Sequence, residues 1–195
     1  MEVKYPYTIT QFTVEQVEAI LTAISEENCE MKKLEIYFIN LSSVDASLLA
    51  RAVNMLEEVQ MYSTELTGQQ TEAIFTAIIE GNCKMKKLDM SGNILSNVDA
   101  GLLASAVNSL EEVKMNFTKL TKDQVEAVLT QSLVNTSLRR LEIGTHRLMG
   151  RRLEIEDYRD SGLGLVRLEL GWLDEDLVAR ATLAIGELRF YAQEG

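Results

Sequence analysis

The chain has 195 residues, of which 46% are hydrophobic and 25% are charged, a composition typical of a soluble globular protein with a sizeable core. The single proline argues against a disordered linker, and no apolar run approaches the roughly 20 residues of a membrane helix. The net charge of −11 argues against a protein that coats nucleic acid, because that affinity depends on neutralising phosphates. It favours a protein partner, and a basic one best matches the charge.

The first ten residues, MEVKYPYTIT, lack the basic start and apolar run of a signal peptide. We therefore expect a reduced, cytoplasmic setting. Cys29 and Cys83 agree with this expectation, because they occupy equivalent places in two repeats. There they would share a packing role and stay free rather than form a disulfide.

Helix-like and strand-like segments alternate along the chain. In chain order they are a helix over 13–24, a strand at MKKLEI (31–36), a helix over 44–53, a strand at LEEVQM (56–61), a helix over 67–78, a strand at MKKLDM (85–90), a helix over 98–107, a strand at LEEVKM (110–115), a helix over 121–132 and a strand at LRRLEI (138–143). The central apolar residues of the strands are Leu34, Val59, Leu88, Val113 and Leu141, at spacings of 25, 29, 25 and 28. Two kinds of unit therefore alternate, and the pair repeats every 54 residues.

The expected helices carry start signals of two kinds. Three begin with Thr-x-x-Gln, the pattern of a capping box, at Thr13/Gln16, Thr67/Gln70 and Thr121/Gln124. The other two follow Asp45 and Asp99, which we expect to act as N-caps. Strands that alternate with helices, joined by crossovers of constant handedness, predict a parallel sheet covered by helices. Neighbouring units must stack, because one unit cannot bury its own apolar face.

One unit reads Met85, Leu88, Met90, Asn93 and Leu95, which is the strand-and-turn pattern of a leucine-rich repeat. The alternating unit lengths, this pattern and the outer helices resemble the ribonuclease-inhibitor type of leucine-rich repeat over about residues 5–148. The resemblance implies an α/β fold, a right-handed solenoid with a curved parallel sheet inside and helices outside. We expect about five clear units with an N-terminal half unit in residues 1–148, and a divergent repeat or cap in residues 149–195.

The two ends of the chain depart from this pattern. Tyr5, Tyr7 and Phe12 align with Val59, Met61 and Leu66, so the chain begins within a unit and is expected to be a fragment or a truncated gene product. RRLEIE (151–156) follows its near-copy RRLEIG (139–144) by only 12 residues, too few for a parallel crossover, which favours a hairpin or an irregular cap. We then expect a repeat strand over 165–173, a helix over 174–185 and an edge strand over 187–191.

The residue before each central apolar position alternates in charge. These residues are Lys33, Glu58, Lys87, Glu112 and Arg140, and parallel neighbours would place them side by side on the concave face. One interpretation is a recognition surface. The other is a cross-strand ladder of opposite charges worth a few tenths to about 1 kcal/mol per pair. We favour the ladder, because it cancels its own charge.

Acidic and aromatic residues follow on the same expected face. Aromatic side chains there would be good anchors for a protein partner, because Trp and Tyr are enriched among binding hot spots; the alternative is that they pack against adjacent loops. The predicted partner-binding residues are Glu35, Tyr37, Phe38, Tyr62, Asp89, Phe117, Glu142 and Trp172. The acids Glu35, Asp89 and Glu142 would attract a basic partner.

No pattern in the sequence indicates a catalytic, cofactor or metal site. His146 is the only histidine and falls where Asn93 falls in another unit, which favours a structural role. A phosphate-binding G-x-x-x-x-G-K-[ST] loop is missing from the sequence. We therefore expect a non-enzymatic binding module without cofactor or metal. The resemblance leaves two alternatives, a fragment of an NLR-like innate immune sensor and a RanGAP-like GTPase activator.

Overall fold

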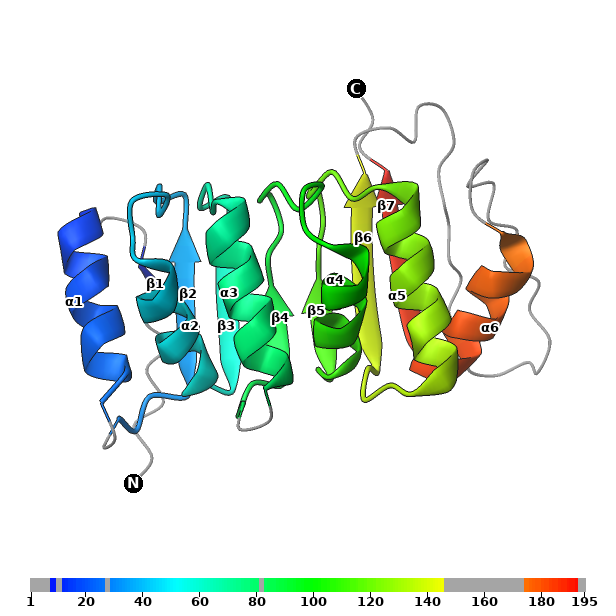
Figure 1. The fold of residues 1–195 in the computed structure, drawn as a ribbon, viewed down its shortest axis with the longest axis horizontal. Helices are drawn as coiled ribbons and strands as arrows, with labels where there is room; N and C mark the ends of the chain where they lie inside the picture. Colours follow the sequence, from blue (N-terminus) through cyan, green and yellow to red (C-terminus); the bar gives the residue numbers. More distant parts are fainter. Residues whose placement is uncertain (1–7, 10–11, 27–28, 81–82, 146–173, 193–195) are drawn as a thin grey trace.

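The computed structural model describes residues 8–9, 12–26, 29–80, 83–145 and 174–192. Strands and helices alternate through them (Figure 1). In chain order they are β1 (Thr8–Ile9), α1 (Val14–Ile24), β2 (Lys33–Tyr37), α2 (Ala46–Asn54), β3 (Glu58–Tyr62), α3 (Gly68–Ile79), β4 (Lys87–Asp89), α4 (Ala100–Asn108), β5 (Glu112–Lys114), α5 (Lys122–Val134), β6 (Arg140–Thr145), α6 (Glu175–Ile185) and β7 (Glu187–Ala192).

The strands form one parallel sheet in the order β1-β2-β3-β4-β5-β6-β7, so each strand pairs with the next one along the chain. The described helices lie together on one side of this sheet, and none of them covers its other side (Figure 1). The predicted α/β alternation with a single parallel sheet is thereby confirmed. The uncovered side is called the open face below.

The helix start signals are confirmed. Both reciprocal bonds of the capping box are present at Thr13, Thr67 and Thr121. Asp45 and Asp99 each accept a hydrogen bond from a backbone N–H in the first turn of the following helix, and Asp174 does the same for α6.

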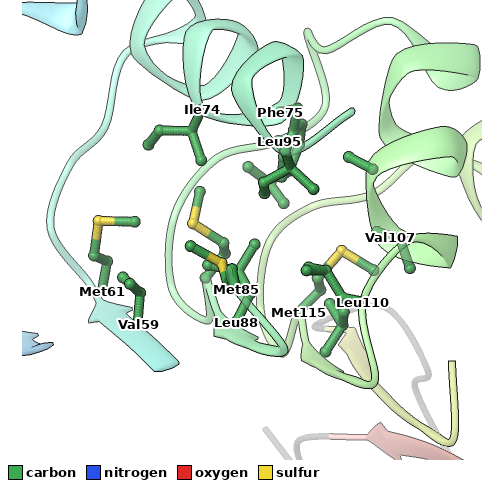
Figure 2. Packing of buried hydrophobic residues seen from close by; sticks show 14 of the residues in the cluster. Val59, Met61, Ile74, Phe75, Met85, Leu88, Leu95, Val107, Leu110 and Met115 are labelled. Atoms are coloured by element: carbon green, nitrogen blue, oxygen red, sulfur yellow. The ribbon is translucent and has the colours of Figure 1, made fainter. Parts of the chain in front are cut away.

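Alternate strand residues point beneath the helices and form the core. Leu34 and Ile36 of β2 have no exposed surface. Val59 and Met61 of β3 and Phe75 of α3 are equally buried between the sheet and the helices (Figure 2). Each such side chain contributes roughly 1.5–3 kcal/mol by leaving water. The residues between them therefore face the opposite side, as the pleat requires.

The structure corrects the prediction for the first strand. The sequence aligned Tyr7 with Met61, but Ile9 pairs with Ile36, which in turn pairs with Met61. The shift is two residues, which keeps the same side chains on each face because strand side chains alternate with period two. Tyr5 and Tyr7 lie outside the described residues.

The C-terminal part is confirmed only in its last two elements. The helix expected over 174–185 is α6 and the strand expected over 187–191 is β7. β7 pairs directly with β6, so the repeat strand expected over 165–173 does not lie between them. That segment, RRLEIE (151–156) and His146 lie outside the described residues.

Cys29 and Cys83 are free thiols, half-buried against the core, as their equivalent positions predicted. Burial raises the pKa of the Cys83 thiol, so it stays protonated near neutral pH. In the described part of the chain, no helix is long and apolar enough to cross a membrane.

Candidate protein-interaction face

The open face carries the outward residues of successive strands in rows that cross the sheet. The first row is the predicted charge ladder, in which Lys33 pairs with Glu58, Glu58 with Lys87, Lys87 with Glu112, and Glu112 with Arg140. The structure extends the row by one residue, because Arg140 pairs with Glu187 of β7. The sequence pattern predicts a strand over 187–191, but the continuation of the charge alternation at Glu187 was not predicted.

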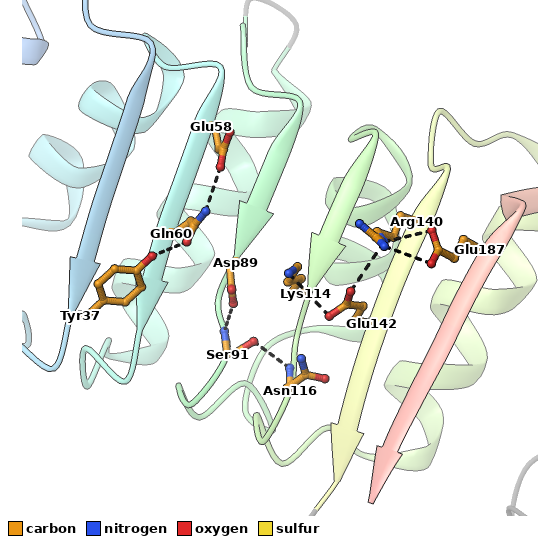
Figure 3. Close-up of polar contacts among 10 residues, drawn as sticks. All are labelled: Tyr37, Glu58, Gln60, Asp89, Ser91, Lys114, Asn116, Arg140, Glu142 and Glu187. Atoms are coloured by element: carbon orange, nitrogen blue, oxygen red, sulfur yellow. Dashed lines mark hydrogen bonds and ion pairs between the residues drawn. The ribbon is translucent and has the colours of Figure 1, made fainter. Parts of the chain in front are cut away.

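Three ion pairs each join two neighbouring residues of this ladder. Lys33 Nζ lies 2.7 Å from Glu58 Oε1, and Lys87 Nζ lies 2.9 Å from Glu112 Oε1. At the far end Arg140 Nε lies 3.0 Å from Glu187 Oε2, and Arg140 Nη2 donates to Glu187 Oε1 at 3.1 Å (Figure 3). Opposite charges that neutralise each other across strands favour a stabilising role for this row.

A hydrogen-bonded network covers β2 and β3 below the ladder. Tyr37 Oη donates to Gln60 Oε1, and Gln60 Nε2 donates to Glu58 Oε1 at 2.8 Å (Figure 3). Lys33 also reaches Glu35 Oε1 at 2.7 Å. Burial raises the pKa of the Tyr37 phenol, so the hydroxyl stays protonated and can keep its donor role at neutral pH.

Glu35, Asp89 and Glu142 stand in one row across the sheet, with Gln60 and Lys114 between them. Glu142 is only 6% exposed, with one carboxylate oxygen 3.8 Å from Lys114 Nζ and the other 3.6 Å from Arg140 Nε. Two of these three acids therefore have a cation beside them, and the row is not a continuous acidic patch.

Asp89 forms a local hydrogen bond in the turn that follows β4. Its Oδ1 accepts a hydrogen bond from the backbone N–H of Ser91 at 2.9 Å, and Ser91 Oγ accepts one from the N–H of Asn116 at 3.1 Å (Figure 3). This carboxylate thus helps to join the turn after β4 to the turn after β5. The sequence could not show this second role, because it depends on the register between strands.

Aromatic residues lie at the rim of the open face, where the strands end. Phe38 is 74% exposed and meets Tyr62 edge to face, with ring centroids 5.2 Å apart and an interplanar angle of 74°. Tyr37, Tyr62 and Phe117 are half-buried. The structure thus brings Tyr37, Phe38 and Tyr62 together at the ends of β2 and β3 and places Phe117 at the end of β5. Trp172 lies outside the described residues.

The turns after β2, β3, β4 and β5 each contain a residue with a left-handed backbone at the same position. φ is 57° at Phe38, 51° at Ser63, 77° at Gly92 and 59° at Phe117. These four residues are equivalent by the register of β2 to β5. Only one of them is glycine, the residue that adopts this conformation without steric cost. Only Gly92 indicates this conformation by its residue type, so it was not predicted for Phe38 and Phe117.

Comparison of this chain with protein-family models and with curated proteins finds no match. Among the described residues, no group of three or more His, Cys, Asp or Glu side chains could hold a metal ion. A function for this chain must therefore be inferred from the geometry of the open face and its aromatic rim.

Proposed function

We propose that the chain is a protein-binding module, built as a leucine-rich repeat solenoid of the ribonuclease-inhibitor type, that holds a partner on its open face without catalysis. Two alternating kinds of strand-helix unit support the repeat type, as does Asn93 at the turn. Its side chain accepts from the N–H groups of Thr64 and Leu66, both at 3.2 Å, and so joins two successive units. A rigid stack of this kind would present its outward residues as one extended site.

The observation that carries the proposal is the placement of Phe38. A left-handed backbone costs a non-glycine residue about 1–2 kcal/mol, and its ring nevertheless stands 74% exposed to solvent. Folding gains little from such a ring beyond its edge contact with Tyr62. Strain kept at an exposed aromatic position fits a residue retained for contact with a partner.

Phe117 repeats this backbone conformation three strands away, in the turn after β5. Strands about 4.8 Å apart separate the two positions by about 14 Å. A partner that contacts both residues therefore spans the rim above β2 to β5, with Tyr62 between them.

The net charge of −11 favours a partner with basic groups, because long-range attraction accelerates encounter. Glu35, Asp89 and Glu142 would contribute to that field rather than act as free contact groups, since each already has a close polar or cationic neighbour. In this proposal the aromatic rim contacts the partner, and the negative net charge of the chain attracts it.

The NLR-like sensor fragment and the RanGAP-like GTPase activator stay predictions from the resemblance. No described residue points to either of them specifically, so the open-face binding module is the function that we carry forward.

The test is capture of a partner with purified chain, comparing wild type with the double variant Phe38→Ala/Phe117→Ala. The matched control is Val134→Ala, because Val134 is 80% exposed on a helix and away from the open face. We expect wild type and Val134→Ala to capture the same protein and the double variant to lose it, with association slowing at high salt. Equal capture by all three proteins would overturn the proposal.

A further inference from the structure

The first described helix exposes a face that its internal copies bury. The compared positions are Gln16, Ile20 and Ala23 in α1 and Gln70, Ile74 and Ala77 in α3. In α3 these side chains are 2%, 0% and 9% exposed, because they pack toward the preceding unit. In α1 the glutamine and the alanine are exposed and Ile20 is only half-buried. Among the described residues, α1 therefore lacks the preceding helix that α3 has in α2.

The exposed glutamine shows what this face binds inside the fold. Gln70 Nε2 donates to the carbonyl oxygens of Leu41 at 2.7 Å and Val44 at 2.6 Å, in the turn before α2. Gln124 makes the equivalent bonds before α4. Gln16 keeps only the capping half of this arrangement: its Oε1 accepts from Thr13, and its Nε2 has no partner among the described residues.

The last described helix exposes the complementary face. α6 is of the same kind as α2 and α4, with an aspartate N-cap at Asp174 and buried residues Val178 and Ala181. In α4 the outward positions are Ala104 and Asn108, which are 4% and 5% exposed, and Asn108 Nδ2 donates to the carbonyl oxygen of Val128 on α5 at 3.0 Å. Their counterparts on α6 are Ala179 and Leu183, both exposed, Leu183 at 86%. α6 therefore exposes the surface that is equivalent to the one by which α4 packs against α5.

The sheet has matching ends as well. The charge ladder begins with Lys33 in β2 and ends with Glu187 in β7. Placed side by side, these two strands would continue the alternation of basic and acidic residues across the junction. β1 occupies that side of β2 with only two paired residues, Thr8 and Ile9, whereas β7 has six residues and lies at the edge of the described sheet.

We propose that copies of this chain associate head to tail, with α1 of one copy packed on α6 of the next. In this arrangement β7 pairs with β2 of the neighbouring copy and replaces the short β1. The contact repeats the α4–α5 arrangement, with Leu183 of one copy packed against the Ile20 side of α1 in the next. The two surfaces differ, so the interface is heterologous and produces a growing chain or a closed ring rather than a symmetric pair.

The first measurement is the molar mass of the purified full chain by light scattering, from micromolar to millimolar concentration. Ala23→Glu removes the α1 face and Leu183→Glu removes the α6 face, both at exposed positions where the fold tolerates a charge. Val134→Glu is the control, because it places the same charge at an exposed apolar residue outside both faces. Circular dichroism verifies that every variant is folded.

We expect the mass of wild type and of Val134→Glu to rise with concentration, and Ala23→Glu and Leu183→Glu to remain single chains. A mixture of the last two retains one intact face of each kind, so it forms a species of two chains and no larger one. A monomeric wild type, or a folded mixture that does not pair, overturns the proposal. A peptide of residues 41–56, which form the turn and helix of an α2-type unit, is then tested for binding to the monomeric chain. Binding would show that the α1 face packs against a repeat unit of a different protein, and self-association would still be overturned.

Discussion

The side-chain amide of Gln70 donates to the carbonyl oxygen of Leu41 at 2.7 Å, so the residue that caps one helix also holds the turn of the preceding unit. The same side chain accepts from Thr67 through its other atom, Oε1, at 2.8 Å. Only an amide can accept and donate in this way. The capping box of this repeat therefore requires glutamine rather than the glutamate that is usual at this position.

Gln70→Glu should reduce stability strongly. The carboxylate can still accept from Thr67, but it would face the carbonyl oxygens of Leu41 and Val44 in a site that is 2% exposed. Burial of a charge against two acceptors, with two hydrogen bonds lost, should lower the free energy of unfolding by about 3 kcal/mol. Urea denaturation at neutral pH measures this difference.

Gln16→Glu is the matched control for that substitution. Gln16 has the same capping partner, Thr13, but is exposed and lacks the two carbonyl neighbours among the described residues. We expect a change within about 0.5 kcal/mol. Similar losses at both positions would show that the capping box alone, and not the bond to the preceding unit, sets the cost.

Asn93→Ala should also be costly, because Asn93 is 1% exposed and joins two units by its side chain. The substitution would leave the N–H groups of Thr64 and Leu66 and the carbonyl of Met61 without their side-chain partner. We expect a loss of about 2–4 kcal/mol in the free energy of unfolding. Asn40→Ala, at an exposed asparagine, should cost less than about 1 kcal/mol by the same assay.

The left-handed position at the strand ends should respond in opposite ways at Phe38 and Gly92. Phe38→Gly should be more stable than Phe38→Ala by about 1 kcal/mol, since both variants lack the ring and only glycine relieves the backbone cost. Gly92→Ala should be destabilising by about 1–3 kcal/mol, because its Cβ would lie 2.2 Å from Ser63 Oγ and 3.1 Å from Ser63 N. Thermal unfolding of the three variants decides this. Equal stability of the two Phe38 variants would mean that the Phe38 backbone is not strained, and strain would then no longer support partner binding.

The repeats made most of the fold predictable from sequence. Leu34, Val59, Leu88, Val113 and Leu141 are in register across the sheet as their spacing predicted, because parallel pairing of equal units allows few other arrangements. The prediction was wrong where the repeat is weakest, at Tyr7. There only two residues pair, and a shift of two leaves the pattern of faces unchanged.

The candidate site was predictable in position but not in its contacts. The sequence placed Glu142 on the outward row, and its 6% exposure follows from Lys114 and Arg140 beside it, which depends on side-chain conformation. The sequence indicated Phe38 as an aromatic residue, but its left-handed backbone belongs to the turn that follows β2, β3, β4 and β5. Such features come from packing between units, which a single sequence pattern does not record.

The Lys33–Glu58 pair should make stability depend on pH in the acid range. Partial burial alone would raise the pKa of Glu58, but hydrogen bonds from Lys33 and Gln60 outweigh it, and the pKa lies below its usual value. The unfolded chain therefore takes up this proton first as the pH falls. The contribution of Glu58 is complete well above the ordinary glutamate pKa of about 4.3 and is lost as the pH falls through the lower, folded-state pKa.

We test this by comparing urea unfolding of wild type and Glu58→Gln at several pH values from neutral into the acid range. Wild type should be more stable at neutral pH by about 0.5–1 kcal/mol, and the two curves should converge as the pH falls below about 4. With Lys33 replaced by Met in both proteins, the difference between them should be small and vary little with pH, because the main hydrogen-bond donor to Glu58 is gone. A difference that stays constant or widens in acid would mean that Lys33 does not hold this carboxylate in its charged form.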